Sequence, residues 1–140
     1  MKIYYREKSG GIEILRCFGI EGRVEIPGMI EDKLVVSAAP YAFSSHMEEK
    51  EELKNACLWE VSDGLGFGRE EHVLAGNDVE EIAFPHTLKE IGRYIFYGCG
   101  NLKKLEFSDS LMQIGCGAFT GCHALETLLV LAKSTGADVV

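Results

Sequence analysis

The chain has 140 residues, with 14 lysines and arginines against 22 aspartates and glutamates, and therefore a formal net charge of −8. This length suits one compact domain, and a hydrophobic content of 46% is too high for a disordered chain. The acidic balance disfavours binding to nucleic acid or to anionic lipid, since both need clusters of basic side chains. We therefore expect a single globular domain, residues 1–140, with no nucleic-acid partner.

The two ends of the chain carry no obvious targeting or membrane segment. Met1–Lys8 lacks the apolar stretch of a secretory signal, and the apolar run Leu128–Ala132 is far too short to span a bilayer. We therefore expect no membrane insertion and a cytoplasmic protein, or a cell-surface protein if the chain is a fragment of a longer one. Cytoplasmic thiols stay reduced, so all five cysteines are expected to be free: Cys17, Cys57, Cys99, Cys116 and Cys122.

Residues 1–23 have the pattern of a β-hairpin. The β-branched and aromatic runs Ile3–Tyr5 and Ile12–Arg16 are separated by Ser9-Gly10-Gly11, which is a turn sequence. A hairpin at this position would cover the open apolar end of the repeats that follow, as repeat proteins require.

Residues 24–45 resemble a degenerate copy of a repeat that is clearer later in the chain. Ser45 and His46 replace the Gly-Cys pair of the later copies. The aligned residues are Ile26-Pro27 with Phe84-Pro85, and Val36, Ala42 and Phe43 with Ile114, Ala118 and Phe119.

Residues 46–78 are an acidic insert or an eroded repeat, with three basic and nine acidic residues. The stretch Met47–Cys57 predicts a short amphipathic helix with Met47, Leu53 and Cys57 facing inward. The glycine-rich remainder predicts a loop or a heavily eroded repeat. The acidic run Glu48–Glu52 is either a docking site for a basic partner or, as such runs usually are, a solvated helix face.

Two clear copies of the repeat occupy residues 79–101 and 102–124, in a gapless register of 23 residues, and a partial third copy with a tail occupies residues 125–140. At the end of Val79-x-x-Ile82-x-Phe84, apolar residues occupy alternate positions, as in a strand with one buried face. Phe96 and Cys99, later in the same copy, are also expected to point inward. One copy cannot bury this set alone, so neighbouring copies must stack. Replacing the equivalent Phe119 by alanine is expected to cost about 3–5 kcal/mol.

This repeat resembles the BspA-like leucine-rich repeat of bacterial proteins. The matching residues are Ile91-Gly92, Phe96, Gly98-Cys99 and Leu102 in one copy, and Ile114-Gly115, Ala118-Phe119, Gly121-Cys122 and Leu125 in the next. The resemblance implies a mainly β fold with short helical segments: a small right-handed leucine-rich-repeat solenoid with its strands on one face. It also implies a non-catalytic protein–protein interaction module. The alternative is a surface adhesion or glycan-binding fragment of a larger exported bacterial protein.

Several residues have side chains that could form a chemical site. In stacked repeats Cys99 and Cys122 would lie about one strand spacing apart, roughly 4.8 Å. That spacing allows a disulfide or a metal site, but the absence of CxxC-type spacing favours a column of buried, reduced thiols. Cys116 aligns with the variable Arg93 and is expected to be exposed. The four histidines show no metal-ligand spacing and read as surface or turn residues: His46, His72, His86 and His123.

Gly64–Gly68 resembles a phosphate-binding loop only superficially, because no Lys-Ser/Thr follows it. The sequence therefore predicts no catalytic residue, no metal and no cofactor.

The outward side of the repeat strands is the best candidate surface, and it would recognise a protein partner or be merely solvated. Glu81 and Lys104 are expected to form a cross-strand charge pair worth about 0.2–1 kcal/mol. The partial third copy lacks a polar cap, which predicts an exposed sheet edge and a homo-oligomer formed through this C-terminal end. The positions expected to face inward are Ile82, Phe84, Leu105, Phe107, Leu128 and Val130. Their neighbours, which are expected to face outward, are Glu81, Ala83, Lys104, Glu106, Thr127 and Leu129.

Overall fold

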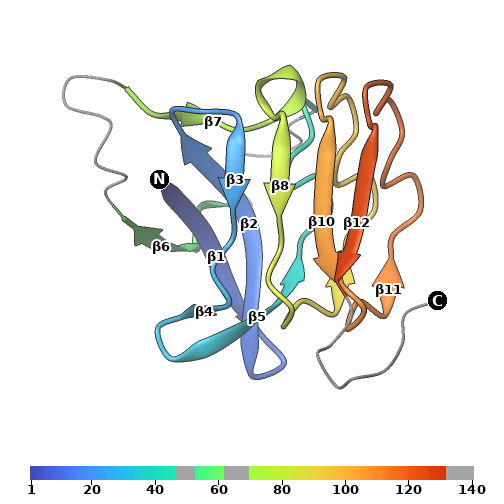
Figure 1. Ribbon diagram of the computed structural model, residues 1–140. Coiled ribbons are helices and arrows are strands. Elements are labelled where there is room, and N and C mark those ends of the chain that lie inside the picture. Colours follow the sequence, from blue (N-terminus) through green and yellow to red (C-terminus); the bar gives the residue numbers. More distant parts are fainter. Residues whose placement is uncertain (47–52, 62–69, 132–140) are drawn as a thin grey trace.

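The structure is a computed structural model that describes residues 1–46, 53–61 and 70–131 (Figure 1). These residues are mainly β, and their helical structure is confined to short 3₁₀ turns such as η2 (Gly76–Asp78). The strands form two sheets that run side by side along the chain's repeats.

The smaller sheet contains four parallel strands in the order β12-β10-β8-β3 (Figure 1). These are β3 (Arg23–Glu25), β8 (Glu81–Ala83), β10 (Lys104–Ser108) and β12 (Thr127–Leu131). Glu81 lies opposite Lys104, and Lys104 lies opposite Thr127, so paired residues are one 23-residue repeat apart. Parallel pairing in this register needs a long connection between strands, which the remainder of each repeat supplies.

The larger sheet has the order β11-β9-β5-β2-β1-β6, and β4 and β7 pair with its strands β5 and β2. Here β5 (Lys33–Ala38), β9 (Glu90–Ile91) and β11 (Gln113–Ile114) are parallel. Each copy of the repeat therefore contributes one strand to each sheet. The sequence predicted strands on one face only, because a two-residue strand such as Glu90–Ile91 is too short to show an alternating pattern.

The N-terminal strands β1 (Lys2–Lys8) and β2 (Gly11–Gly19) pair in the antiparallel sense, as the pattern of residues 1–23 predicted. Their turn is made by Ser9 and Gly10, which both have positive φ. β2 then continues into the repeats by pairing in parallel with β5. The side chains of Ile3, Ile12 and Ile14 are buried, which places the hairpin on the apolar core.

The first copy of the repeat follows the later copies with a five-residue insertion. Twelve positions separate Ile26 from Ala38, whereas seven separate the equivalent Phe84 from Ile91. The additional residues form the small antiparallel pair of β4 (Met29–Ile30) with the start of β5. Ala38 therefore occupies the position of Ile91 and Ile114. The predicted match of Val36 with Ile114 is wrong because it ignored this insertion.

Residues 53–61 differ from the predicted amphipathic helix. The end of that segment forms β6 (Cys57–Glu60), which pairs with β1. Cys57 is exposed and does not face inward. Met47, the acidic run at residues 48–52 and the glycine-rich run at residues 64–68 lie outside the described residues. β7 (His72–Val73), which pairs with β2, is a further strand that the sequence did not reveal.

A column of phenylalanine rings forms the centre of the core. The Phe43 and Phe96 rings stack at 6.1 Å, and the Phe96 and Phe119 rings stack at 5.7 Å. Phe43 and Phe96 are fully buried, and Phe119 is partly buried against the same cluster. The predicted inward position of the aromatic residue is thus confirmed in all three copies.

The glycines of the Ile-Gly motif mark the closest approach between copies. A Cβ on Gly92 would lie 2.3 Å from the Pro40 nitrogen, and one on Gly115 would lie 2.2 Å from the Arg93 nitrogen. These contacts involve backbone atoms, which cannot swing aside as a side chain can. Glycine is therefore required at these two positions by close packing of one copy on the preceding one.

Candidate functional site

The outward positions of the smaller sheet form two rows. One row contains Arg23, Glu81, Lys104 and Thr127 in mutual register. The second row contains Glu25, Ala83 and Glu106, and the backbone register extends it to Leu129, whose side chain, like that of Val130, lies outside the described part of the chain. We call the eight residues of these two rows the strand face. The residues between the rows on β8 and β10, Ile82 and Leu105, are buried, as predicted for inward positions.

The strand face is lined by charge of both signs. A groove of about 290 Å³ runs across it, bounded mainly by Arg23, Glu25, Glu81, Lys104 and Glu106. Arg23 Nε donates to Glu81 Oε2 at 2.5 Å. Glu81 therefore pairs with Arg23 of β3, and not with Lys104 as the sequence predicted, although Lys104 lies opposite it.

At the C-terminal edge of this sheet the inward position is open. Leu128 lies in register with the buried Leu105, yet it is 50% exposed. The register agrees with the predicted inward position of Leu128, and its exposure agrees with the open edge expected of the partial third copy. A repeat side chain becomes buried only when a further layer covers it.

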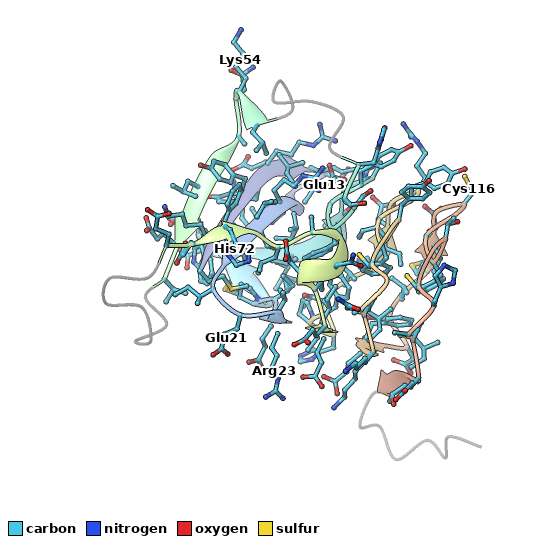
Figure 2. All side chains as sticks on the ribbon, turned by 90° about the horizontal axis from the view of Figure 1, so that it is seen from above. Glu13, Glu21, Arg23, Lys54, His72 and Cys116 are labelled. Carbon is cyan, nitrogen blue, oxygen red and sulfur yellow. The ribbon has the colours of Figure 1, made fainter. Side chains whose placement is uncertain are left out.

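A buried carboxylate joins the hairpin to the repeats. Glu13 on β2 is 1% exposed and accepts from Arg6 Nε at 2.6 Å, Lys8 Nζ at 3.0 Å and Ser37 Oγ at 2.9 Å. Lys8 and Ser37 also donate to Glu90 on β9, at 2.6 and 3.0 Å. Figure 2 shows Glu13 enclosed by the ribbon rather than at its rim. Because each of these groups has a partner, the cluster fastens β1, β2, β5 and β9 together.

The same cluster borders a cavity of about 520 Å³. Lys8 lowers the pKa of the Glu90 carboxyl by its hydrogen bond, and Ser37 contributes in the same direction. The Glu90 and Glu13 carboxylates in turn raise the pKa of Lys8. These shifts stabilise the charged forms, so neither group is set to exchange a proton near neutral pH.

The cysteines are all free. Cys99 Sγ donates to the Phe43 carbonyl at 3.1 Å, and Cys122 Sγ donates to the Phe96 carbonyl at 3.4 Å. Each thiol thus reaches back to the phenylalanine of the preceding copy. Burial raises the pKa of Cys99 to about 12 and raises that of Cys122 as well. The interpretation of this pair as a column of reduced thiols fits these contacts, and Cys116 is exposed as predicted.

The histidines lie at the surface, as the sequence predicted. Among the described residues, no group of three or more histidine, cysteine or acidic side chains is arranged to hold a metal ion. His46 differs from the others because its ring contacts the rings of Tyr41 and Tyr97.

These contacts belong to an aromatic cluster that the sequence analysis did not identify. Its members are Tyr41, His46, Tyr94 and Tyr97, which together line a hollow of about 200 Å³. A signal was present in the sequence, because Tyr41 and Tyr94 both stand two residues before the inward phenylalanine of their copies.

Two solved structures resemble this fold. A leucine rich cell surface protein from Faecalibacterium prausnitzii A2-165 superimposes with a TM-score of 0.60 and 19% identity, over 92% of this chain and 30% of that chain. The T. pallidum Leucine Rich Repeat protein superimposes with a TM-score of 0.51 and 16% identity, over 93% of this chain and 83% of that chain. This chain thus spans only part of the length of the Faecalibacterium protein, and likeness at such identity shows the fold alone.

A search of the curated proteins gives no match to the sequence. None of the helical segments in residues 1–46, 53–61 and 70–131 has the length and apolarity needed to cross a membrane. The sequence model described as "BspA type Leucine rich repeat region (6 copies)" matches residues 70–136. This match covers the clear copies of the 23-residue repeat and agrees with the resemblance of the Ile-Gly and Gly-Cys motifs. Residues 70–136 therefore belong to the BspA-type leucine-rich repeat family.

Proposed function

We propose that the chain is a non-catalytic interaction module that binds a protein partner through its strand face. The observation that carries this proposal is the in-register placement of charged residues on three neighbouring parallel strands, β3, β8 and β10. Such a surface is held by backbone hydrogen bonds and presents side chains at the fixed spacing of a sheet. The residues proposed to contact the partner are Glu81, Ala83, Lys104, Glu106, Thr127 and Leu129.

The charge pattern of the strand face favours a partner with basic groups. The second row carries Glu25 and Glu106, and neither is held in an ion pair with the first row as Glu81 is. Complementary charge guides association and fixes the register of a complex more than it adds affinity. A partner presenting lysine or arginine opposite Glu25 and Glu106 fits this arrangement.

The state of the buried thiols supports a non-catalytic role. Nucleophilic cysteines have a lowered pKa and an electropositive, accessible setting. Burial has the opposite effect here, because it raises the pKa of both Cys17 and Cys99 to about 12. These thiols are protonated at neutral pH and are poor nucleophiles.

The architecture behind this proposal is a right-handed leucine-rich-repeat solenoid with the N-terminal hairpin as its cap. It is supported by the 23-residue register in both sheets and by the position of β2 beside β5. Within this proposal the chain is divided into a hairpin at 1–23, repeats at 24–45, 79–101 and 102–124, an insert at 46–78 and a partial repeat at 125–140.

The test exchanges two charges on the strand face. The variant K104E/E106K keeps the net charge and leaves the buried Leu105 untouched. A matched control, K89E/E60K, makes the same exchange at two exposed positions off the strand face. Affinity for a partner identified by proximity crosslinking should fall with the first variant only. Equal affinity for wild type and K104E/E106K would refute the strand face as the binding surface.

A second candidate function is surface adhesion or glycan binding as a fragment of a larger exported protein. The observation that favours it is the likeness to a leucine rich cell surface protein, of which the chain covers 30%. Detection of the native protein on intact cells by surface proteolysis would support this location. Recovery only in the cytoplasmic fraction would support the cytoplasmic alternative.

We also propose self-association through the C-terminal layer. Met112, Ile114 and Leu128 are exposed apolar side chains on or beside the edge strands β11 and β12. Exposed edges and apolar patches of this kind promote pairing between chains. Sedimentation analysis should show a dimer that dissociates in L128K/I114K. A monomer at all concentrations would contradict the proposal.

A further inference from the structure

The aromatic cluster lies on a different side of the molecule from the strand face. The Tyr41 and Tyr94 rings stack with centroids 5.6 Å apart and planes inclined by 19°. Tyr97 meets Tyr94 edge-on at 6.0 Å, and His46 is 6.5 Å from Tyr97. The Tyr94 amide donates to the carbonyl of Cys116, and Figure 2 shows Cys116 well away from Arg23 of the strand face.

Two of these tyrosines occupy a backbone conformation that disfavours them. Tyr41 has φ 61° and Tyr94 has φ 51°, whereas the equivalent residue of the next copy is Gly117, with φ 67°. The left-handed region costs a residue with a side chain roughly 1–2 kcal/mol. Glycine would avoid this cost, and the core does not need the rings because both are only partly buried. Strain of this kind concentrates at functional sites.

The turn that carries Tyr41 is held rigidly from below. The buried Arg16 Nη1 donates to the carbonyls of Tyr41, Ala42 and Ser44 at 2.5, 3.0 and 3.3 Å. The Tyr94 ring in turn lies where a side chain on Gly117 would be, since a Cβ there would fall 2.3 Å from Tyr94 Cε1. A fixed backbone under partly exposed rings is the arrangement expected of a preorganised binding surface.

The chemistry of the hollow defines its ligand. The described residues that line it include no aspartate, glutamate, lysine or arginine, so they offer no counter-ion to a formally charged ligand. Aromatic faces are electron-rich and attract flat surfaces of polarised C–H groups, while tyrosine hydroxyls and imidazole nitrogens hydrogen-bond to ligand hydroxyls. A volume of about 200 Å³ is below the roughly 300–1,000 Å³ of pockets for drug-sized ligands, so the hollow suits one ring.

We propose that Tyr41, His46, Tyr94 and Tyr97 form a binding site for one neutral pyranose ring of a glycan. This proposal rests on the second candidate function above, for which it supplies a site. It is independent of the strand face, so the two surfaces can be tested separately.

The test uses substitutions that other copies of the repeat already contain. Y41G introduces the residue found at Gly117, and Y97T introduces the residue found at Thr120. Y41G removes the ring and relieves the backbone strain, so it should not destabilise the fold. The matched control Y4T removes a tyrosine whose ring contacts Phe18 in the hairpin, away from the cluster. Saturation-transfer NMR and titration calorimetry would be run with cellotetraose, maltotetraose and N-acetylchitotetraose, and with choline as a cationic probe.

The expected result is binding of at least one of the three oligosaccharides by wild type and by Y4T. Each aromatic contact is worth about 0.5–1.5 kcal/mol, so Y41G and Y97T should each weaken binding by about two- to twelvefold. The strand-face variant K104E/E106K should retain full sugar affinity.

Three results would overturn the proposal. They are the absence of sugar binding at millimolar concentration, unchanged affinity in the double variant Y41G/Y97T, and binding of choline without any sugar. The last outcome would identify the cluster as a cage for a quaternary ammonium group. A loss of sugar binding in K104E/E106K but not in Y41G would instead place glycan recognition on the strand face.

Discussion

The repeats 79–101 and 102–124 contain the same residues at the same positions but differ in burial. Ile91 is 2% exposed, whereas the equivalent Ile114 is 50% exposed. Phe96 and Cys99 are fully buried, whereas Phe119 and Cys122 are only partly so. Among the described strands, β9 has β5 and β11 as neighbours, but β11 has only β9.

The difference shows that a repeat side chain in this fold is buried by the adjacent copy and not by its own copy alone. Within the single repeat 102–124, Leu105 on β10 is fully buried beside β12, while Ile114 on the edge strand β11 is not. Truncating a repeat side chain should therefore lower the free energy of unfolding more when that side chain contacts two neighbouring copies than when it contacts one. The following predictions test this rule, from the largest expected effect to the smallest.

Removing the central phenylalanine of the inner repeat should have the largest effect. Phe96 stacks on both Phe43 and Phe119, so F96A should lower the free energy of unfolding by about 3–5 kcal/mol. Phe119 is partly exposed and has one ring neighbour in the column, so F119A should cost clearly less than the 3–5 kcal/mol that the sequence alone suggested. Urea unfolding followed by circular dichroism would measure both values. Equal losses would show that the outer repeat is covered as fully as the inner one.

Substitutions of the motif glycines Gly92 and Gly115 should be equally destabilising in the inner and outer repeats, because each glycine contacts the copy before it. G92A and G115A would each place a Cβ within 2.3 Å of backbone in the preceding copy. Overpacking of this kind costs about 1–3 kcal/mol, and both variants should lose similar amounts of stability. G28A is the control, since its Cβ would meet only ordinary contacts at 3.6 Å or more. A mild G115A beside a severe G92A would mean that the outer repeat shifts freely on its neighbour.

The buried thiols should make the inner repeat sensitive to alkali. Burial raises the pKa of Cys99 to about 12 in the folded state, against about 8.5 in an unfolded chain. Stability is then fully present below pH 8.5 and falls by up to about 1.4 kcal/mol per unit for this thiol as the pH rises toward 12. C99A should flatten the decline in the urea midpoint between neutral pH and pH 10 more than C122A does. Identical slopes for the two variants would contradict the difference in burial.

The sequence predicted the hairpin pairing, the 23-residue register and the inward phenylalanines because each depends on local patterns of apolar residues. It did not predict the second ladder, since the pairing of Glu90-Ile91 with Gln113-Ile114 depends on how copies stack. The outward residues of the strand face could be predicted because side chains along a strand alternate between its two faces. The aromatic cluster could not, because the contact between the Tyr41 and Tyr94 rings depends on how one copy stacks on the next and not on a local pattern of apolar residues.

The smallest expected effect concerns the acidic side of the pH range. Glu90 has a lowered pKa because Lys8 and Ser37 donate to its carboxylate, whereas the outer repeat has the neutral Gln113 at this position. The stability that Glu90 contributes is present above the unfolded value of about 4.3 and is lost as the pH falls through the lower folded value. The carboxylate is about one-third exposed, so solvent screens the interaction and its contribution stays below about 1 kcal/mol. E90Q, which copies the outer repeat, should be slightly less stable than wild type at pH 7 and equally stable at pH 3, as measured by urea unfolding. A constant difference at both pH values would assign the effect of Glu90 to packing rather than to its charge.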